Sequence, residues 1–431
     1  MKANDLSKLR SLIPKSEVDN SVAFTSLADP SPLLEFIAQS LDRRVTLDDF
    51  KILQPWVLAA LAALGRRTEG ERVYIETLHQ SDSAKFAYSL GLDDIIDGEK
   101  AHGPAQEGRT VKLCTVATYE EIEPVSDKIA SMIISDVNDA PADDYIDAEE
   151  VWKTIRYVMI ELLRNVIQHS YDRPGGIILA QRMDKGIIYP EPVIQVAVTD
   201  CGIGILESLR ATHPDIASAG VALERSIWPY YSGKFHSFEA GAPQNAGMGL
   251  FFVSEMAKLT SGRVLLSSRG ASLFIQGDPA ALGNNKIDIL PVGYPGTLVA
   301  FEMPKRGVSD YDQLIKRIVE IARERRTKAE THHWLRYDIA PQGTLEFLIN
   351  IASENTVRAE AFAKSELIPR IESGQAIVLN FINMKICTQS FMHALLFSVV
   401  KRAFELKVPV YVKGTSESVR DGIRLVEMYT L

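Results

Sequence analysis

The chain has 431 residues, of which 46% are hydrophobic and 24% are charged, and its formal net charge is -9. The length predicts about three domains, and the composition is typical of a folded globular protein rather than a disordered one. An acidic chain is not expected to bind nucleic acid through its overall charge, because such affinity rests on lysine and arginine side chains that neutralise phosphates.

The cysteines and the apolar runs predict a cytoplasmic protein. Cys114, Cys201 and Cys387 lie far apart, without the paired spacing of a zinc site or a redox motif. The opening stretch MKANDLSKLRSLIPKSEVDN lacks the apolar segment of a signal peptide. The longest apolar runs, 57–64 and 395–400, are shorter than the ~20 residues that a membrane-spanning helix needs. We therefore expect no contact with a membrane.

Residues 45–96 have the pattern of a small α/β unit. VTLDDF and ERVYIETL predict strands, whereas PWVLAALAALGRR and SDSAKFAYSLGL predict helices, the second of which ends at Gly91. We predict a separate N-terminal α/β module over 1–110.

The central segment opens with a strong helix signal. Asp147 and Glu150 have the spacing of a capping box, and apolar residues follow at helical spacing. These apolar residues are Val151, Ile155, Met159, Leu162 and Val166. Strands are predicted at 176–182, 193–199, 263–268, 272–276 and 297–301. The prediction for 111–305 is an α/β sandwich.

A helical connector is predicted over 306–335. It begins with a capping box formed by Ser309 and Asp312. It ends in a basic cluster that we interpret as a solvated face, with a nucleic-acid patch as the alternative. The cluster comprises Arg323, Arg325, Arg326 and Lys328.

The C-terminal segment, 336–431, repeats the α/β pattern of the N-terminal one. Strands are predicted at 376–382 and 408–414, a helix lies between them at 390–406, and a second helix closes the chain.

Four short motifs follow one another in the central segment. The first is ELLRNVIQHS (161–170), the second TDCGIGI (199–205), the third NAGMGL (245–250) and the fourth PGTLVAF (295–301). As an ordered set they resemble the N, G1, G2 and G3 boxes of the GHKL superfamily. This ATP-binding domain is shared by gyrase, heat-shock chaperone, histidine-kinase and mismatch-repair ATPases and by anti-sigma serine kinases. The resemblance covers roughly residues 142–305. It implies a histidine-kinase-like ATP-binding domain, the Bergerat fold, with ATP and Mg²⁺ as ligands.

In the first motif, Glu161 and Asn165 are four residues apart, so their side chains project from one face of a helix. The resemblance implies that Asn165 holds Mg²⁺ and that Glu161 acts as a general base. The residues alone also fit an ordinary polar patch on a half-exposed helix. His169 lies in the same helix, and we expect a hydrogen-bonded, partly buried imidazole rather than a phosphoacceptor.

In the second motif, Asp200 ends a predicted strand, and Gly202 and Gly204 follow it. Glycine permits close backbone approach or a positive φ. The resemblance assigns to Asp200 a hydrogen bond from the adenine amino group, with the two glycines beside it. Thr297 in the fourth motif is expected near the adenine, although a threonine that only forms a strand is the alternative. A Rossmann motif is excluded because Glu207 stands where its third glycine would be, and no P-loop motif occurs.

The segment 206–244 has the length and position of an ATP lid. Lys234 within it is a candidate phosphate contact, with a solvated lysine as the alternative. In the third motif, Gly247 and Gly249 precede a predicted helix, whose free N–H groups can bind phosphate oxygens. The resemblance extends the binding residues of this motif to Met248 and Leu250.

The sequence IVLNFINMKICTQSFMHALL (377–396) resembles STAS-like domains, the fold of anti-sigma-factor antagonists. Gln389 stands where phosphorylated members carry serine, so we expect Thr388 or Ser390 to cap the helix instead. The stretch LDDFKILQPWVLAAL (47–61) resembles the same family more weakly.

The fold class predicted from the sequence is α/β, with a central GHKL sandwich flanked by two small α/β modules, the C-terminal one STAS-like. The resemblance implies a Mg-ATP-binding regulatory protein, an ATPase or protein kinase, whose modules recognise a STAS or signalling partner. A serine/threonine protein kinase of the anti-sigma type, a mismatch-repair or gyrase-like ATPase, and a non-hydrolysing ATP-gated scaffold are the alternatives. A homodimer is compatible with each of them.

Overall fold

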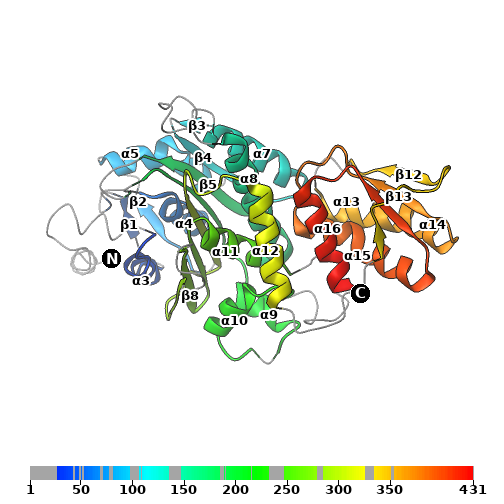
Figure 1. Ribbon diagram of the computed structural model, residues 1–431. Helices are drawn as coiled ribbons and strands as arrows, with labels where there is room; N and C mark the ends of the chain where they lie inside the picture. Colours follow the sequence, from blue (N-terminus) through cyan, green and yellow to red (C-terminus); the bar gives the residue numbers. More distant parts are fainter. Residues whose placement is uncertain are drawn as a thin grey trace. The chain divides into compact units, whose positions relative to one another are not determined.

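The computed structural model describes residues 27–41, 44–47, 50, 53–67, 71–76, 81–97, 106–107, 109–134, 147–184, 189, 191–214, 216–232, 247–278, 285–325, 334–350 and 354–430. The chain is mixed α/β and forms two compact units (Figure 1). The first unit comprises 1–210, 215–225 and 253–309, and the second comprises 211–214, 226–252 and 310–431. None of the helices in the described residues combines the length and the apolar composition needed to cross a membrane.

The first unit is built on an eight-stranded sheet in the order β3-β4-β5-β6-β10-β7-β8-β9, with antiparallel neighbours throughout. The strands are β3 Gln106–Glu107, β4 Thr110–Val116, β5 Gly176–Met183, β6 Val193–Asp200, β7 Arg263–Ser268, β8 Ala271–Gln276, β9 Lys286–Leu290 and β10 Thr297–Pro304. The five strands predicted in the central segment are confirmed. β10 follows β9 along the chain but lies between β6 and β7.

Helices α7 (Tyr119–Ile134) and α8 (Ala148–Asn165) pack against each other and contact β4, β5 and β6. The cap predicted for α8 is confirmed, because Asp147 Oδ1 accepts hydrogen bonds from the backbone N–H groups of Glu149 at 3.2 Å and Glu150 at 3.4 Å. The predicted apolar stripe of this helix is buried. A π-helical turn, η3 (Val166–Ser170), continues α8.

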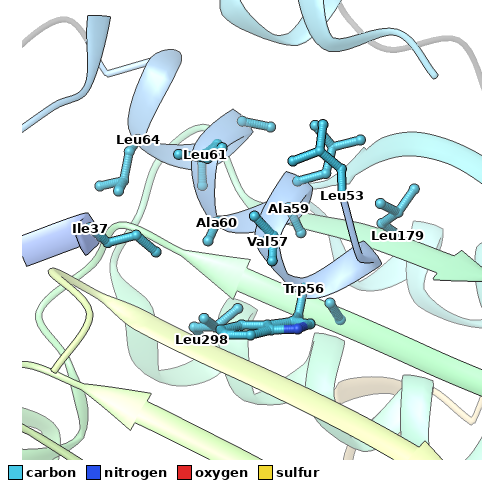
Figure 2. Packing of buried hydrophobic residues seen from close by; sticks show 14 of the residues in the cluster. Ile37, Leu53, Trp56, Val57, Ala59, Ala60, Leu61, Leu64, Leu179 and Leu298 are labelled. Carbon is cyan, nitrogen blue, oxygen red and sulfur yellow. The ribbon is translucent and has the colours of Figure 1, made fainter. Parts of the chain in front are cut away.

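Helix α4 (Pro55–Gly65) contacts β5, β6 and β10. All its residues from Pro55 to Leu64 are buried, as expected for a helix that is apolar on every side. Figure 2 shows Trp56 close to Leu298 of β10, with Leu179 of β5 nearby. Side chains alternate between the two faces of a strand, so α4 covers one face of the sheet.

The predicted boundary at residue 110 does not separate compact units. The N-terminal helices and strands form as predicted, and β1 pairs with β2 in parallel, but they share one apolar core with the sheet. The reason is that α4 has no polar face to present to water and therefore needs the sheet. The remaining N-terminal elements are α3 Ser31–Ser40, β1 Arg44–Thr46, β2 Tyr74–Glu76, α5 Asp82–Ser89 and α6 Leu92–Ile96.

The second unit contains a parallel four-stranded sheet in the order β11-β14-β13-β12. The predicted strand, helix, strand and helix of the C-terminal segment are confirmed as β13, α15, β14 and α16, whereas β11 and β12 were not predicted. The elements are α12 Tyr311–Arg325, β11 Leu335–Arg336, β12 Leu345–Leu348, α13 Thr356–Phe362, η5 Ala363–Leu367, α14 Ile368–Glu372, β13 Ile377–Asn380, α15 Gln389–Leu406, β14 Val410–Lys413 and α16 Glu417–Thr430.

The helix predicted as a connector is α12, and it packs against α16 within the second unit. Its first turn is closed by Asp310, whose Oδ1 accepts a hydrogen bond from the Gln313 N–H at 2.9 Å. This corrects the cap predicted at Ser309. Arg326 and Lys328 of the basic cluster lie outside the described residues.

Candidate functional site

The first motif occupies the end of α8 and the turn η3. Glu161 is 1% exposed, and its Oε1 lies 3.1 Å from Nη1 of Arg164, which is 2% exposed. Two buried opposite charges one turn apart form a pair whose rupture leaves an uncompensated buried charge. The residue predicted as a general base is therefore engaged by a cation of its own helix.

Asn165, the last residue of α8, carries an unsatisfied polar group. Its Nδ2 is buried and has no hydrogen-bond partner within the described part of the chain. Most buried polar side-chain atoms are hydrogen-bonded, and an unsatisfied one costs about 1–3 kcal/mol. A half-turn of the side-chain amide exchanges its nitrogen and oxygen. Asn165 can therefore present either a donor or an acceptor to a ligand.

Asp200 ends β6 and is 3% exposed. Burial raises the pKa of its carboxyl from 3.8 to about 7, hydrogen bonds from the backbone of Gly202 and Thr297 oppose this rise, and the charge of Asp172 adds to it. The Gly202 N–H donates to Asp200 Oδ1 at 2.9 Å. A buried carboxyl that titrates near neutral pH is typical of functional sites.

The backbone of the second motif lies against the end of the first. The Ile203 N–H donates to the Ser170 carbonyl at 2.9 Å, and a Cβ atom at Gly202 would overlap that carbonyl oxygen. Gly204 has a φ of 81°, which is the positive φ that glycine permits and that the sequence offered as one reason for the glycines of this motif. These contacts bring Asp200 and the end of α8 into one region of the first unit.

The fourth motif joins the same region through the sheet. Thr297, the first residue of β10, is directly opposite Asp200 in the antiparallel β6–β10 ladder. Residues paired in this way project from the same face of a sheet. The structure thus places Asp200 and Thr297 side by side at the end of two paired strands. It also places the Ser170 carbonyl, five residues after Asn165, against Gly202 and Ile203.

The third motif is described with the second unit, because the division between the units passes through α11 (Gly249–Leu259) after residue 252. The predicted helix after this motif is confirmed. Gly247 has a φ of 62°, and its carbonyl accepts a hydrogen bond from the Tyr231 N–H at 3.3 Å. Met248 is fully buried and Leu250 is half-buried.

The predicted lid contains two short helices, α9 (Ile205–Arg210) and α10 (Ala219–Ser226). Lys234, the predicted phosphate contact, lies outside the described residues. His169 is half-buried, and its Nδ1 lies 3.4 Å from Ser208 Oγ, so the predicted hydrogen-bonded imidazole is confirmed.

Sequence reasoning missed two charged residues of this region. Asp172 Oδ2 accepts a hydrogen bond from the Cys201 N–H at 2.8 Å and pairs with Arg66 Nη2 at 3.2 Å. Asp172 stands two residues beyond the first motif, and that proximity was the available signal. Arg66 follows α4 in a different part of the sequence, where no motif marks it.

No family model, curated protein or solved structure matches this chain.

Proposed function

We propose that this chain is a Mg-ATP-binding regulatory protein of the GHKL type. The observation that carries the proposal is the presence of two unusual buried groups on two motifs whose backbones touch. These groups are the carboxyl of Asp200 and the amide nitrogen of Asn165, which has no hydrogen-bond partner among the described residues. Both can be satisfied by a polar ligand with a donor at one end and a metal-bound phosphate at the other.

Asp200 is the proposed adenine contact. Its ionised carboxylate accepts hydrogen bonds, and the adenine amino group is a donor of matching chemistry. Thr297 is the proposed neighbour that contacts the ring through its hydroxyl or a water molecule. The buried position strengthens such hydrogen bonds, because the local dielectric is low. Gly202 and Gly204 form the loop beside this contact.

Asn165 is the proposed protein ligand of Mg²⁺. The described residues contain no group of three His, Cys, Asp or Glu side chains that could hold a metal ion. A single amide oxygen from Asn165 suits Mg²⁺, because this ion binds few protein oxygens and keeps waters and substrate phosphate oxygens as its other ligands. When bound, Mg²⁺ would neutralise phosphate charge.

The proposed phosphate contacts rest mainly on sequence. The segment 247–250 contains Gly247, Met248, Gly249 and Leu250, and α11 begins within it at Gly249. N–H groups at the start of a helix favour anions. Lys234 remains a predicted contact from the lid. The assignment of these five residues as phosphate contacts is what the resemblance of the motifs implies.

If Glu161 acts as a general base, the chain is an ATPase or a protein kinase that acts on a STAS-like partner. The pairing of this carboxylate with Arg164 favours a second candidate, a non-hydrolysing ATP-gated scaffold. The two candidates differ in turnover and not in binding.

Two measurements on the full chain test the proposal. Calorimetric titration with ATP and ADP, each with Mg²⁺, should give binding at or below millimolar concentration. An absence of binding to both nucleotides would refute the proposed function. Incubation with γ-labelled ATP, alone and with candidate STAS proteins, then separates the candidates. Free phosphate indicates an ATPase, labelled protein a kinase, and neither product a scaffold.

A further inference from the structure

The residues after α4 reach the loops of the proposed adenine site. The Arg66 guanidinium donates to Asp172 Oδ2 at 3.2 Å and also to the Gly175 carbonyl. Arg67, the next residue, donates to the Pro295 carbonyl at 3.4 Å. Arg66 and Asp172 are 106 residues apart in the sequence. A segment far from the four motifs thus contacts the C-terminal flank of the first motif and the fourth motif.

The backbone that follows Asp200 is held from two directions. The Cys201 N–H donates to Asp172 Oδ2 at 2.8 Å, and the Cys201 thiol donates to the Ala63 carbonyl of α4 at 3.3 Å. Arg66 and Asp172 side chains are only 7% and 11% exposed. Removing the guanidinium would leave a buried carboxylate without its counter-charge, which is costly.

The charges that face Asp200 oppose one another. Asp172 acts to raise the pKa of the Asp200 carboxyl, and Arg66 acts to lower it. Cys201 and Tyr294 are neutral near pH 7, because burial raises the pKa of the Cys201 thiol to about 11 and holds the pKa of the Tyr294 hydroxyl well above its usual range. The Arg269 guanidinium donates to the Gly202 carbonyl at 3.3 Å, and it pairs with Glu71 at 3.0 Å. The charged side chains that act on the pKa of Asp200 itself are Arg66 and Asp172.

We propose that Arg66 is a positioning residue for nucleotide binding, which holds Asp172 against the Cys201 amide and balances the charge next to the adenine contact. The N-terminal segment thereby sets both the affinity and the pH range of the site. This inference rests on the proposed function, since it requires Asp200 to act in its ionised form.

Substituting each member of the Arg66–Asp172 pair should shift the pH midpoint of nucleotide binding, and the two shifts should have opposite signs. Arg66→Gln removes the positive charge, so Asp200 should ionise at higher pH, and nucleotide binding should be lost at a higher pH on acidification. Asp172→Asn removes the negative charge, so the loss should move to lower pH. Each shift should be roughly half a pH unit or more. Damage to packing alone would weaken binding in both variants without moving their pH midpoints in opposite directions.

The experiment measures the dissociation constant of a fluorescent ATP analogue with Mg²⁺ from pH 5.5 to 8.5, using the full chain. Titration of the phosphates is common to all variants and cancels in the comparison. Arg66→Lys keeps the charge but loses the paired geometry, so it should bind about tenfold more weakly with a midpoint near that of the wild type. Arg72→Gln is the control for loss of a nearby guanidinium that forms no ion pair with Asp172, because Arg72 lies over the Tyr74 ring at 3.9 Å and donates to the Arg67 carbonyl at 3.4 Å.

The outcomes separate the two proposals. Opposite shifts for Arg66→Gln and Asp172→Asn, with no shift for Arg72→Gln, support the inference. Equal midpoints, or shifts of the same sign, overturn it while leaving nucleotide binding intact. Failure of the wild type to bind at any pH overturns both. Circular dichroism of each variant verifies folding. If Arg66→Gln does not fold, a lower midpoint for Asp172→Asn supports the inference, and an unchanged or higher midpoint overturns it.

Discussion

Polar side chains are buried at the end of α8 in the first unit and at the start of α15 in the second, but the two sites differ in whether these side chains are hydrogen-bonded. At the start of α15, Thr388 Oγ1 accepts a hydrogen bond from the Phe391 N–H at 3.4 Å, and the Thr388 N–H donates to Glu354 Oε2 at 2.9 Å. At the end of α8, Asn165 Nδ2 is buried without a partner in the described residues.

This difference indicates that the polar side chains at the start of α15, the structural cluster, stabilise the fold, whereas those at the end of α8 suit a ligand. Thr388 and Ser390 are 1% and 3% exposed, and the first is engaged as a helix cap. A kinase could reach them only if the helix start opened. The α8 region instead keeps an amide nitrogen without a partner in the described residues, and the turn that follows α8 contacts the loop after Asp200. A bound polar ligand would stabilise such an unsatisfied group.

Asp200→Asn should produce the largest effect on ligand binding. The substitution replaces an acceptor by an amide whose N–H groups oppose the adenine amino group, so ATP affinity should fall by about 10²-fold. Calorimetric titration at pH 8 provides the measurement. An unchanged affinity would show that Asp200 does not contact the nucleotide, and it would contradict the interpretation of the α8 region as a ligand site.

Glu161→Gln tests the chemistry apart from binding. A general base matters once the attacking oxygen loses its proton, so turnover should fall by about 10² while Mg-ATP affinity stays within a few-fold. The amide keeps the size of the side chain and an acceptor for Arg164, but it removes the counter-charge of this buried cation, so urea unfolding of the variant accompanies the turnover measurement. Phosphate release measures turnover, and a variant as fast as the wild type would favour the scaffold.

Asp200→Asn should also stabilise the ligand-free protein at pH 8. The folded carboxyl has a pKa of about 7, above its unfolded value of 3.8, so the folded state binds more protons between these values and its stability falls as pH rises. The full shift corresponds to about 4 kcal/mol; an amide loses part of the backbone hydrogen bonding, so we expect a gain of about 2 kcal/mol. Urea unfolding at pH 8 and pH 3.5 gives the measurement, and an equal gain at both pH values would contradict ionisation as the cause.

Asn165→Ala should weaken Mg-ATP binding by about tenfold, since it removes the proposed metal ligand. The free energy of unfolding should not fall, because Nδ2 has no partner among the described residues and its removal relieves the cost of an unsatisfied buried group. Binding with and without Mg²⁺ is the relevant comparison. A similar loss under both conditions would argue against a role in metal binding.

Thr388→Val should give the smallest effect and the opposite pattern. Loss of the cap should lower the free energy of unfolding by about 1 kcal/mol and leave nucleotide affinity unchanged. Denaturant unfolding and calorimetry together measure both quantities. Weaker nucleotide binding in this variant would contradict the division into a structural cluster and a ligand site.

Local signals in the sequence were sufficient for much of this fold. The Asp147 and Thr388 caps and the strands predicted between residues 176 and 301 formed as expected. The cap of α12 was displaced by one residue, because Asp310 and Ser309 are both suitable capping residues and local sequence does not choose between them.

Long-range partners were beyond such signals. Helix α4 was predicted from its composition, but nothing in its sequence names β5, β6 and β10 as the surface that covers it. Arg66 and Asp172 are separated by 106 residues and share no periodicity, so their pairing emerges only from the folded sheet. Asp200 was identifiable at a strand end, whereas the burial that raises its pKa was not.

The position of β10 has a consequence for the order of assembly. This strand is translated after β7, β8 and β9, yet it separates β6 from β7 in the finished sheet. Until residue 304 is available, β6 therefore lacks the neighbour that its exposed edge requires, and Asp200 lacks its partner Thr297. Such non-local pairing slows folding, so the adenine end of the proposed site belongs to the late-forming part of the nascent chain.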